Sequence, residues 1–446
     1  MSLVKPRLSF WQIWMMNFGF FGIQYSFGLQ QGSMSPIYSY LGADPQKLAF
    51  LWMAGPVTGL IVQPIIGAMS DKTWTRWGRR TPYFFVGALV ASIGLLLMPF
   101  SSAVWMAASL LWILDASNNV AQEPFRAFIS DRLDKSQHSL GFLMQSAFTG
   151  LGQTLAYLTP SILLYLGLFK GRMSNNIPNI TMAAFLIGAV ASIGSVLVSI
   201  KTTPELKPSP EELEIIRKNK TGVFDAFKEI FLAFGSMPKA MWQLSIMMFF
   251  QWYAMFCYWQ YNSLSVAKTI FHTTDPKSET FVTANLWANQ CNAFYNAITF
   301  VSSFFLVRIA LKYGAKKVHM ACLLLVGISL FFYPSIENKY LLFLPMFGLG
   351  VAWASMMSMP YVMVAGSIPA VRTGVYLGIF NMFIVVPMLI ETATLEGLYN
   401  TVLAKNPENV IRLSGILLLC AAVATTFVQY KKPAPDQPFV KVSVGH

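Results

Sequence analysis

The sequence predicts an all-α membrane protein with about twelve transmembrane helices in two six-helix bundles, and with both termini in the cytoplasm. Three observations favour this fold class. Of the 446 residues, 55% are hydrophobic and only 11% are charged, whereas a typical soluble domain has about 25% charged residues. The apolar residues form long runs separated by short polar loops, and the positive charges gather in alternate loops. A soluble globular protein is therefore excluded.

The long apolar runs define the spans. A helix needs about 20 apolar residues to cross the hydrocarbon core of a bilayer. The first run is too long for a cleaved signal peptide, so it is interpreted as the first span. The expected spans lie at residues 10–39, 47–70, 82–100, 103–130, 139–168, 180–200, 240–267, 281–307, 317–334, 340–366, 374–402 and 409–430.

The distribution of Lys and Arg orients these spans. Loops on the N-terminal side carry 23 of these residues and loops on the opposite side carry 8, while Arg126 lies within a span. Because cytoplasmic loops are enriched in Lys and Arg, both ends of the chain are expected in the cytoplasm. The expected location is a bacterial inner (plasma) membrane.

A polar stretch divides the chain into two halves. We expect a first bundle at residues 1–200, a cytoplasmic linker at 201–239, a second bundle at 240–430 and a tail at 431–446. Prolines in the segment PELKPSPEEL break regular structure there. The halves also resemble each other faintly, with Pro124 matching Pro360, as parallel repeats in transporters do.

The span at 103–130 carries an acid near its middle. Asp115, Asn118, Asn119, Gln122 and Arg126 fall on one helical face and form a polar stripe about 16 Å long. An intramembrane carboxylate is costly unless it is paired, hydrated or protonated, so Asp115 is a candidate for proton binding. The alternative is a structural Asp and Arg that satisfy neighbouring helices.

Other spans carry neutral polar stripes. Amide side chains both donate and accept hydrogen bonds, which suits sugar hydroxyls better than an ion. They also join helices within membranes, and this alternative stays open for each residue. Trp259 lies near such residues and could stack on a sugar ring, while the role of Glu391 is left open between a cavity residue and a buried structural pair. The stripes are Asn285, Asn289, Asn292 and Asn296; Asn17, Gln24 and Gln31; and Gln145, Thr149 and Gln153.

The sequence offers little support for an enzyme. It has no Walker A motif, and its loops are too short for an ATPase domain. The four cysteines lie in apolar runs without paired spacing, and the four histidines are expected in loops and at ends, so neither a metal nor another cofactor is expected. The expected partners are a small sugar, a proton and the lipid bilayer; nucleic acid is not expected, and the chain is predicted to be a monomer.

The loop at 67–82 resembles the loop between the second and third helices of the major facilitator superfamily, with Gly67, Asp71, Gly78, Arg79 and Arg80 matching. Its longer form is similar to the glycoside-pentoside-hexuronide cation symporters. Within them, the chain resembles plant sucrose/proton symporters and bacterial maltose and α-glucoside carriers. The segments that carry this resemblance are GIQYSFGLQQGSMSPIYSYLG, WMAGPVTGLIVQPIIGAMSD, NNVAQEPFRAFISD and GVYLGIFNMFIVVP.

The resemblance implies the major facilitator fold, with Asp115 as the proton-coupling acid and Arg126 as a substrate-associated residue. The chain departs from the plant pattern at Ala43 and Asp44, where a His is usual, and at Met388, where a Gln is frequent. These departures leave the choice of sugar open.

We therefore expect a proton-coupled symporter that imports a disaccharide such as maltose, sucrose or a related α-glucoside. A sodium-coupled carrier, a sugar exporter and a transport-like sugar receptor are the alternatives. Opposite charges at neighbouring helix ends further predict that Asp71, Arg79 and Arg80 form a conformational latch.

Overall fold

The computed structural model describes residues 6–44, 47–133, 137–207, 214, 234–365 and 373–429. Within these residues the protein is helical, with twelve long helices, a short helix α2 (Leu48–Leu51) and the 3-10 turns η2 (Met98–Phe100), η4 (Tyr333–Ser335) and η5 (Lys339–Leu342). The long helices are α1 (Phe10–Tyr40), α3 (Ala54–Lys72), α4 (Thr81–Leu97), α5 (Val104–Arg132), α6 (His138–Tyr165), α7 (Asn179–Thr202), α10 (Lys239–Thr269), α11 (Glu279–Tyr313), α12 (Ala315–Phe332), α13 (Phe343–Ala365), α14 (Thr373–Thr401) and α15 (Pro407–Phe427).

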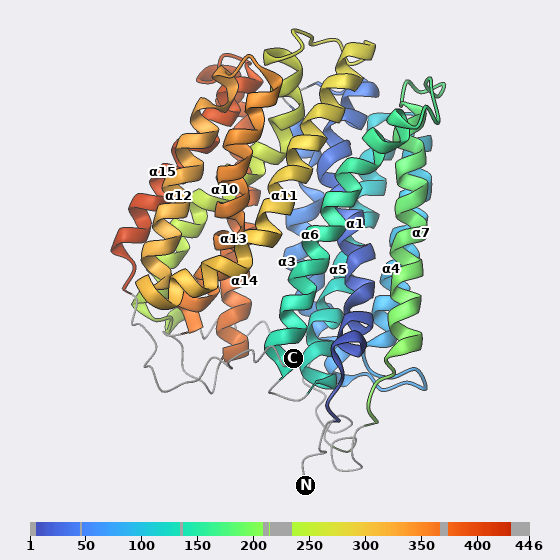
Figure 1. The fold of residues 1–446 in the computed structure, drawn as a ribbon, viewed down its shortest axis with the longest axis vertical. Helices are drawn as coiled ribbons and strands as arrows, with labels where there is room; N and C mark the ends of the chain where they lie inside the picture. The colour runs from blue at the N-terminus through green and yellow to red at the C-terminus, as the bar shows by residue number, and fades with distance from the viewer. Residues whose placement is uncertain are drawn as a thin grey trace, which may run out of the picture.

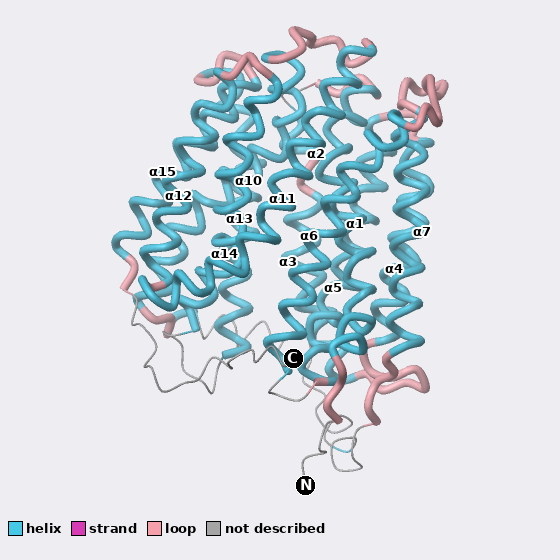
Figure 2. Tube along the Cα trace, in the orientation of Figure 1, coloured by secondary structure: helices cyan, strands magenta, loops and turns pink. Residues whose placement is uncertain are grey.

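The long helices stand side by side in two groups, α1 to α7 and α10 to α15 (Figures 1 and 2). The first residue of α1 and the last residue of α15 lie at the same end of the molecule, which we call the termini end; the opposite end is the outer end. The predicted twelve helices in two bundles are thus confirmed. The expected linker falls largely outside the described residues, at 208–213 and 215–233, and the expected tail at 431–446 lies wholly outside them.

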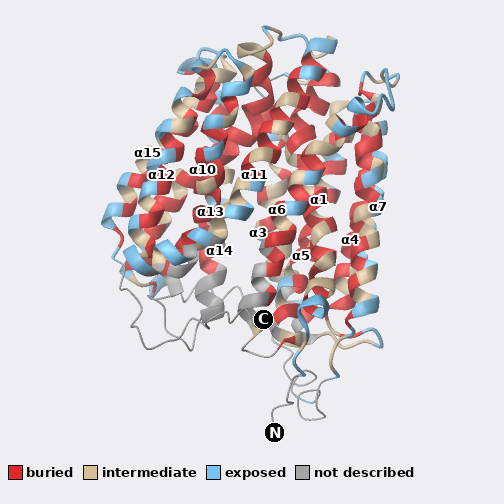
Figure 3. Cartoon of the chain, in the orientation of Figure 1, coloured by how far each residue is buried: buried red, intermediate tan, exposed pale blue. Residues whose placement is uncertain are grey.

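Hydropathy differs between the helices. Six segments of the described chain are long and apolar enough to cross a membrane by composition alone, and they comprise α4, α7, α12, α13, α14 and α15. The remaining long helices include α1, α5, α6 and α11, which carry the predicted polar stripes. Much of α1 and α10 is buried among other helices (Figure 3). Their polar side chains are therefore shielded from lipid by the more apolar helices.

The outward surface of the bundles is apolar. Trp105, Val190, Leu344 and Phe427 each expose more than two thirds of their surface. Such side chains along helices that span a bilayer face hydrocarbon rather than water. The exposed apolar surface thus agrees with a multi-pass membrane protein.

The expected span at 47–70 is wrong in one respect, because the structure divides it into α2 and α3. The break falls at Trp52 and Met53, just before Gly55 and Pro56. Proline lacks an N–H group and disfavours helical geometry in the residue before it. The interruption lets the Trp52 ring meet Phe256 of α10 edge to face, with ring centroids 6.2 Å apart.

Glycines allow α1 to pack closely within the first bundle. A Cβ on Gly22 would overlap Ser195 and Ala191 of α7, and a Cβ on Gly28 would stand 2.8 Å from Ala156 of α6. At these two positions a side chain would push the helices apart. The close contacts make α1, α6 and α7 one packed unit.

Candidate functional site

Asp115 lies buried on α5, eleven residues from the outer end of that helix. Only 5% of its surface is exposed, and no hydrogen-bond or ion-pair partner of its carboxylate is found in the described part of the chain. Gly55 of α3 lies beside it, since a Cβ built there would stand 3.5 Å from a carboxylate oxygen, in van der Waals contact. A buried acid without a cation is costly when ionised, so the arrangement suits a group that binds a proton.

The two asparagines of the α5 stripe join α5 to its neighbours. Asn118 donates to the Ser26 hydroxyl of α1 at 2.9 Å, and its Oδ1 atom is buried without a partner among the described residues. Asn119 donates to Thr58 at 3.1 Å and accepts from Gln63 at 2.7 Å, both on α3. Asn119 thus links α5 to α3 and would have to share these groups with a substrate, whereas the Asn118 oxygen has no donor among the described residues.

Gln122 and Arg126 complete the stripe toward the termini end. Gln122 is 8% exposed, and Arg126 is exposed. Eleven residues separate Arg126 from Asp115, a rise of about 16 Å along a straight helix, so the structure does not bring the two charges into contact. Asp115 and Arg126 both fall on the predicted face of α5, but at different depths along the helix axis.

The predicted amides Gln24 and Gln31 of α1 both accept hydrogen bonds from α6. The Gln153 amide donates to Gln24 Oε1 at 3.0 Å, and the Tyr157 hydroxyl donates to Gln31 Oε1 at 2.8 Å. These bonds hold α1 against α6 inside the first bundle. Any contact with a substrate would have to share these groups.

The predicted asparagine stripe of α11 contacts helices of both bundles. Asn292 accepts from Tyr258 at 2.8 Å and from Asn262 at 3.2 Å, both on α10, so it joins two helices of the second bundle. Asn289 lies against α1, since a Cβ on Gly32 would stand 2.6 Å from its Oδ1 atom. Asn285 is buried, and its Oδ1 atom has no partner among the described residues. Asn289 therefore lies at the boundary between the halves, whereas Asn292 lies within one of them.

Three tryptophans form a cluster on the second bundle, which we call the Trp cluster. The ring of Trp353 on α13 lies 5.8 Å from Trp252 and 5.5 Å from Trp259, both on α10, measured between centroids. Phe256 lies on the same face of α10, one turn from each of them, and contacts Trp52 of the first bundle. The Trp cluster thus borders the boundary between the halves. Sequence reasoning missed Trp353, because a single Trp in an apolar helix does not reveal its orientation.

The predicted latch residues hold several helix ends of the first bundle together. Arg80 Nε donates to Asp131 of α5 at 2.7 Å, and Arg80 Nη1 donates to the Ser70 hydroxyl of α3 at 2.5 Å. Arg79 Nε donates to the Ser70 carbonyl at 3.3 Å. The Asp71 side chain lies outside the described residues. Asp131 was missed because it lies 51 residues from Arg80 in the sequence.

A second acid at this end was also missed. The Glu205 carboxylate accepts from the backbone N–H groups of Arg79, Arg80 and Thr81 at 2.7, 2.8 and 2.6 Å, and from the Thr81 hydroxyl at 2.7 Å. It therefore caps the N-terminus of α4, where the helix dipole favours an anion. Gly78 has a φ of +114°, and a Cβ there would overlap this carboxylate.

Contacts between the halves are found at the outer end. Arg172, in the loop between α6 and α7, pairs with Glu279 of α11 at 2.9 Å and donates to the Ser278 carbonyl at 3.0 Å. Its guanidinium lies 5.6 Å from the ring centroid of Tyr40, which meets Phe281 edge to face. Deeper inside, the Gln290 amide of α11 donates to Ser161 of α6 at 3.1 Å. These contacts hold the outer ends of the two bundles together.

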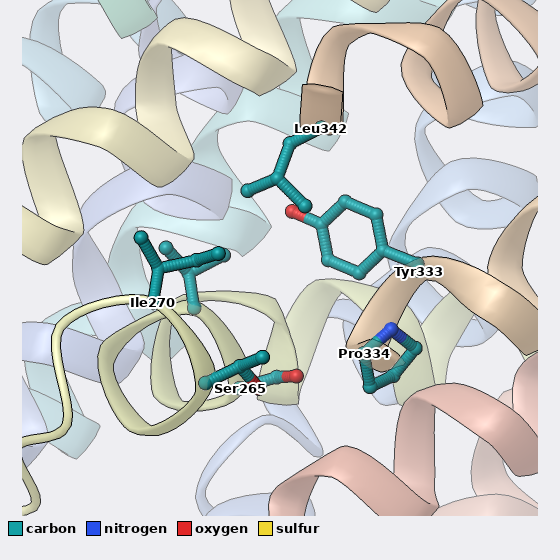
Figure 4. A pocket seen from close by; sticks show the side chains of 7 residues that line it. Ser265, Ile270, Tyr333, Pro334 and Leu342 are labelled. Atoms are coloured by element: carbon teal, nitrogen blue, oxygen red, sulfur yellow. The ribbon is translucent and has the colours of Figure 1, made fainter. Parts of the chain in front are cut away.

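A small pocket at the outer end involves the second bundle alone. It lies between the end of α10 and the turns η4 and η5 (Figure 4). The Tyr333 hydroxyl, beside this pocket, donates to Asn262. The pocket includes none of the predicted site residues, and Ser265, Ile270, Tyr333, Pro334 and Leu342 are among those that line it.

His319 lies near the start of α12, within the expected span at 317–334, and is fully buried; its Nδ1 atom contacts the Ser355 hydroxyl at 2.9 Å. The other ring nitrogen faces the Met247 sulfur at 3.4 Å. Both nitrogens are thus occupied by neighbours within the second bundle, as in a structural histidine.

Comparisons with known proteins agree with this architecture. Residues 16–392 match the family model described as Major Facilitator Superfamily. The chain is 24% identical to the sucrose transport protein SUT5 of Oryza sativa subsp. indica, over 85% of this chain and 81% of that protein. It is 25% identical to the sucrose transport protein SUC4 of Arabidopsis thaliana, over 83% and 80% of the two chains.

Solved structures share the fold. The xylose transporter XylE from E. coli, in a partially occluded inward open conformation, superposes with a TM-score of 0.67 at 14% identity, covering 95% of this chain and 99% of that one. A bacterial homolog of the human lysosomal transporter Spinster, inward-facing and unoccupied, gives a TM-score of 0.64 at 15% identity over 95% and 98%. At such low identity these matches establish the fold alone.

Proposed function

Since this chain belongs to the major facilitator superfamily, and is a membrane transporter distantly related to plant sucrose transporters, we propose that it is a proton-coupled symporter. Its substrate is a disaccharide such as maltose, sucrose or a related α-glucoside. The bundles at 1–200 and 240–430 rock about a central site and are joined by the linker at 201–239. The predicted latch at Asp71, Arg79 and Arg80 controls the rate of this motion without binding the sugar.

The observation that carries the proposal is the setting of Asp115. Its carboxylate is buried, has no cationic partner among the described residues and lies beside Gly55, three residues after Trp52. Trp52 in turn contacts the face of α10 that bears Trp252 and Trp259. The proton-binding group and the Trp cluster therefore belong to surfaces that meet at the same boundary.

The sugar is proposed to bind between these surfaces. Aromatic rings stack on the apolar faces of sugar rings, while neutral amides and a guanidinium can bind hydroxyls. The oxygens of Asn118 and Asn285 that lack a partner among the described residues support this role, as does the exposed position of Arg126. The remaining proposed binding residues are Asn119, Gln122, Gln24, Gln31, Gln153, Asn289, Asn292 and Trp259.

The test is uptake of radiolabelled maltose and sucrose into proteoliposomes with an imposed inward proton gradient. We expect Asp115→Asn to abolish gradient-driven accumulation while retaining sugar exchange, because exchange does not require the site to release its proton. Glu123→Gln, which neutralises a half-buried acid on the same helix, is the control and should accumulate sugar normally.

Three results would contradict the proposal. Undiminished gradient-driven accumulation by Asp115→Asn would remove this residue from proton coupling. Accumulation by the wild type that follows a sodium gradient instead would favour the sodium-coupled alternative, and sugar binding without any flux would favour a receptor.

A further inference from the structure

Glu391 is a second buried acid, in the bundle opposite Asp115. It lies on α14, ten residues or about 15 Å from the outer end of that helix, and is 0% exposed. Asp115 lies eleven residues from the outer end of α5, so the two acids occupy similar depths in opposite halves. Sequence reasoning left Glu391 without a role because no polar stripe surrounds it.

The groups around Glu391 are neutral. Its carboxylate contacts the Cys257 sulfur at 3.4 Å and the Gln260 amide nitrogen at 3.2 Å, both on α10. The other titratable groups that face it are the hydroxyls of Tyr253 and Tyr261, also on α10. No cation pairs with it in the described part of the chain. An unpaired, fully buried carboxylate is unfavourable when ionised, so this environment suits the neutral acid.

A hydrogen-bond acceptor for the proton of neutral Glu391 lies close to its carboxyl group. The Gln260 Oε1 atom is buried and has no hydrogen-bond partner among the described residues. A half-turn of the Gln260 amide would direct this oxygen, rather than the NH₂ group, toward Glu391. The neutral acid could then donate its proton to an oxygen that otherwise lacks a donor.

The same segment of α10 also closes the boundary between the halves. The Gln260 carbonyl accepts from the Ser35 hydroxyl of α1 at 2.9 Å, and the Ser35 oxygen accepts from the Trp52 indole at 3.1 Å. Trp52 also packs against Phe256, one turn before Gln260. Separation of the outer ends would break these contacts and admit water beside the residues that enclose Glu391.

We propose that Glu391 is a second proton-binding residue of the transport cycle, which must be protonated before the outer end can close. This inference rests on the proposed proton-coupled function. The carboxylate takes one proton from outer water before closure and returns it to water when these contacts next separate. Because the closed arrangement then binds the proton more tightly than the open one, low pH favours closure and high pH favours opening of the outer end.

The test measures the distance between spin labels at the outer ends of the two bundles, at exposed positions 166 and 340. The protein is full-length, sits in lipid nanodiscs without sugar, and carries Cys420→Ser because Cys420 is the native cysteine that is not fully buried. We expect the wild type to open as pH rises and Glu391→Gln to stay closed, with complete loss of this pH dependence. Glu396→Gln, an exposed acid five residues further along α14, is the control and should behave as wild type.

An opening of Glu391→Gln that matches the wild type at every pH would overturn the inference. If this variant fails to fold, infrared spectroscopy of Asp115→Asn provides the test. The carbonyl band of a protonated acid should vanish as the outer end opens, and Cys257→Ser should shift this band because it changes the donor that contacts Glu391. The absence of such a band would contradict the inference.

Neither measurement contains sugar, so the two proposals can fail separately. A missing sugar flux with pH-dependent opening intact would refute the proposed substrate and leave Glu391 as a proton-binding residue. Normal proton-driven uptake with pH-independent opening would refute only the role of Glu391.

Discussion

Replacing Arg172 by Ala should open the outer end of the transporter. Arg172 belongs to the first bundle, yet its guanidinium pairs with Glu279 and donates to the Ser278 carbonyl of the second. The Arg172 side chain is only 16% exposed, whereas that of Glu279 is 82% exposed. The substitution removes both contacts between the halves and leaves the rest of α11 unchanged.

The size of the expected shift toward the open outer end follows from these two contacts. A solvent-screened ion pair with an exposed carboxylate contributes about 0.2–1 kcal/mol. A hydrogen bond from a charged donor contributes about 1.5–3 kcal/mol, and the carbonyl of Ser278 keeps access to water once the bond is lost, which favours the lower end of that range. Together they amount to about 2 kcal/mol, or roughly a 30-fold shift of the equilibrium toward the open outer end.

The assay is the same label pair at positions 166 and 340, read at a fixed pH. Lys170→Ala, an exposed cation two residues away in the same loop, is the matched control and should leave the distance distribution unchanged. Arg172→Lys keeps the charge but loses the planar fork, so an intermediate opening is expected. If Arg172→Ala and Lys170→Ala gave the same distribution, these contacts would not hold the outer end closed.

Two further substitutions test the polar contacts within each half. Glu205→Ala should lower the free energy of unfolding by about 1–3 kcal/mol, and with it the melting temperature in detergent, because three N–H groups at the start of α4 lose a charged acceptor. Glu337→Ala, which removes an exposed acid, is the control. Equal melting temperatures of the two variants would contradict the proposed helix cap. Asn292→Ala should lower the melting temperature as well as raise the sugar Kd, since it leaves two donors of α10 without their acceptor and removes a proposed binding group. Asn289→Ala should raise the sugar Kd a few-fold with little change in the melting temperature. The reverse pattern, with Asn289 as the destabilising position, would contradict the division of roles between these residues.

The fold could be predicted from the sequence because membrane burial is a local signal. Each helix must satisfy its own backbone, so a run of about 20 apolar residues is enough to define a span. The break between α2 and α3 was less visible, since Trp52 and Met53 are apolar themselves. The contacts of Trp52 with Phe256 and Ser35 show what the interruption provides.

The candidate site could be predicted only in part. Helical spacing places Asp115 and Gln122 on one face, but it cannot show how that helix is rotated against its neighbours. The partners of Asn292 lie 30 and 34 residues away, and Asp131 and Glu205 lie 51 and 125 residues from Arg80. These pairings depend on tertiary packing, so the periodicity of the sequence could not predict them.

The contacts at the outer end form a surface to which both bundles contribute. Arg172 and Glu279 lie side by side only while the bundles meet there, and the Glu279 carboxylate remains accessible. An antibody fragment that recognises both residues would bind a composite epitope that exists in one conformation. Such a fragment would be both a reporter of that conformation in cells and an inhibitor, because it would trap the carrier before it could open to the other side.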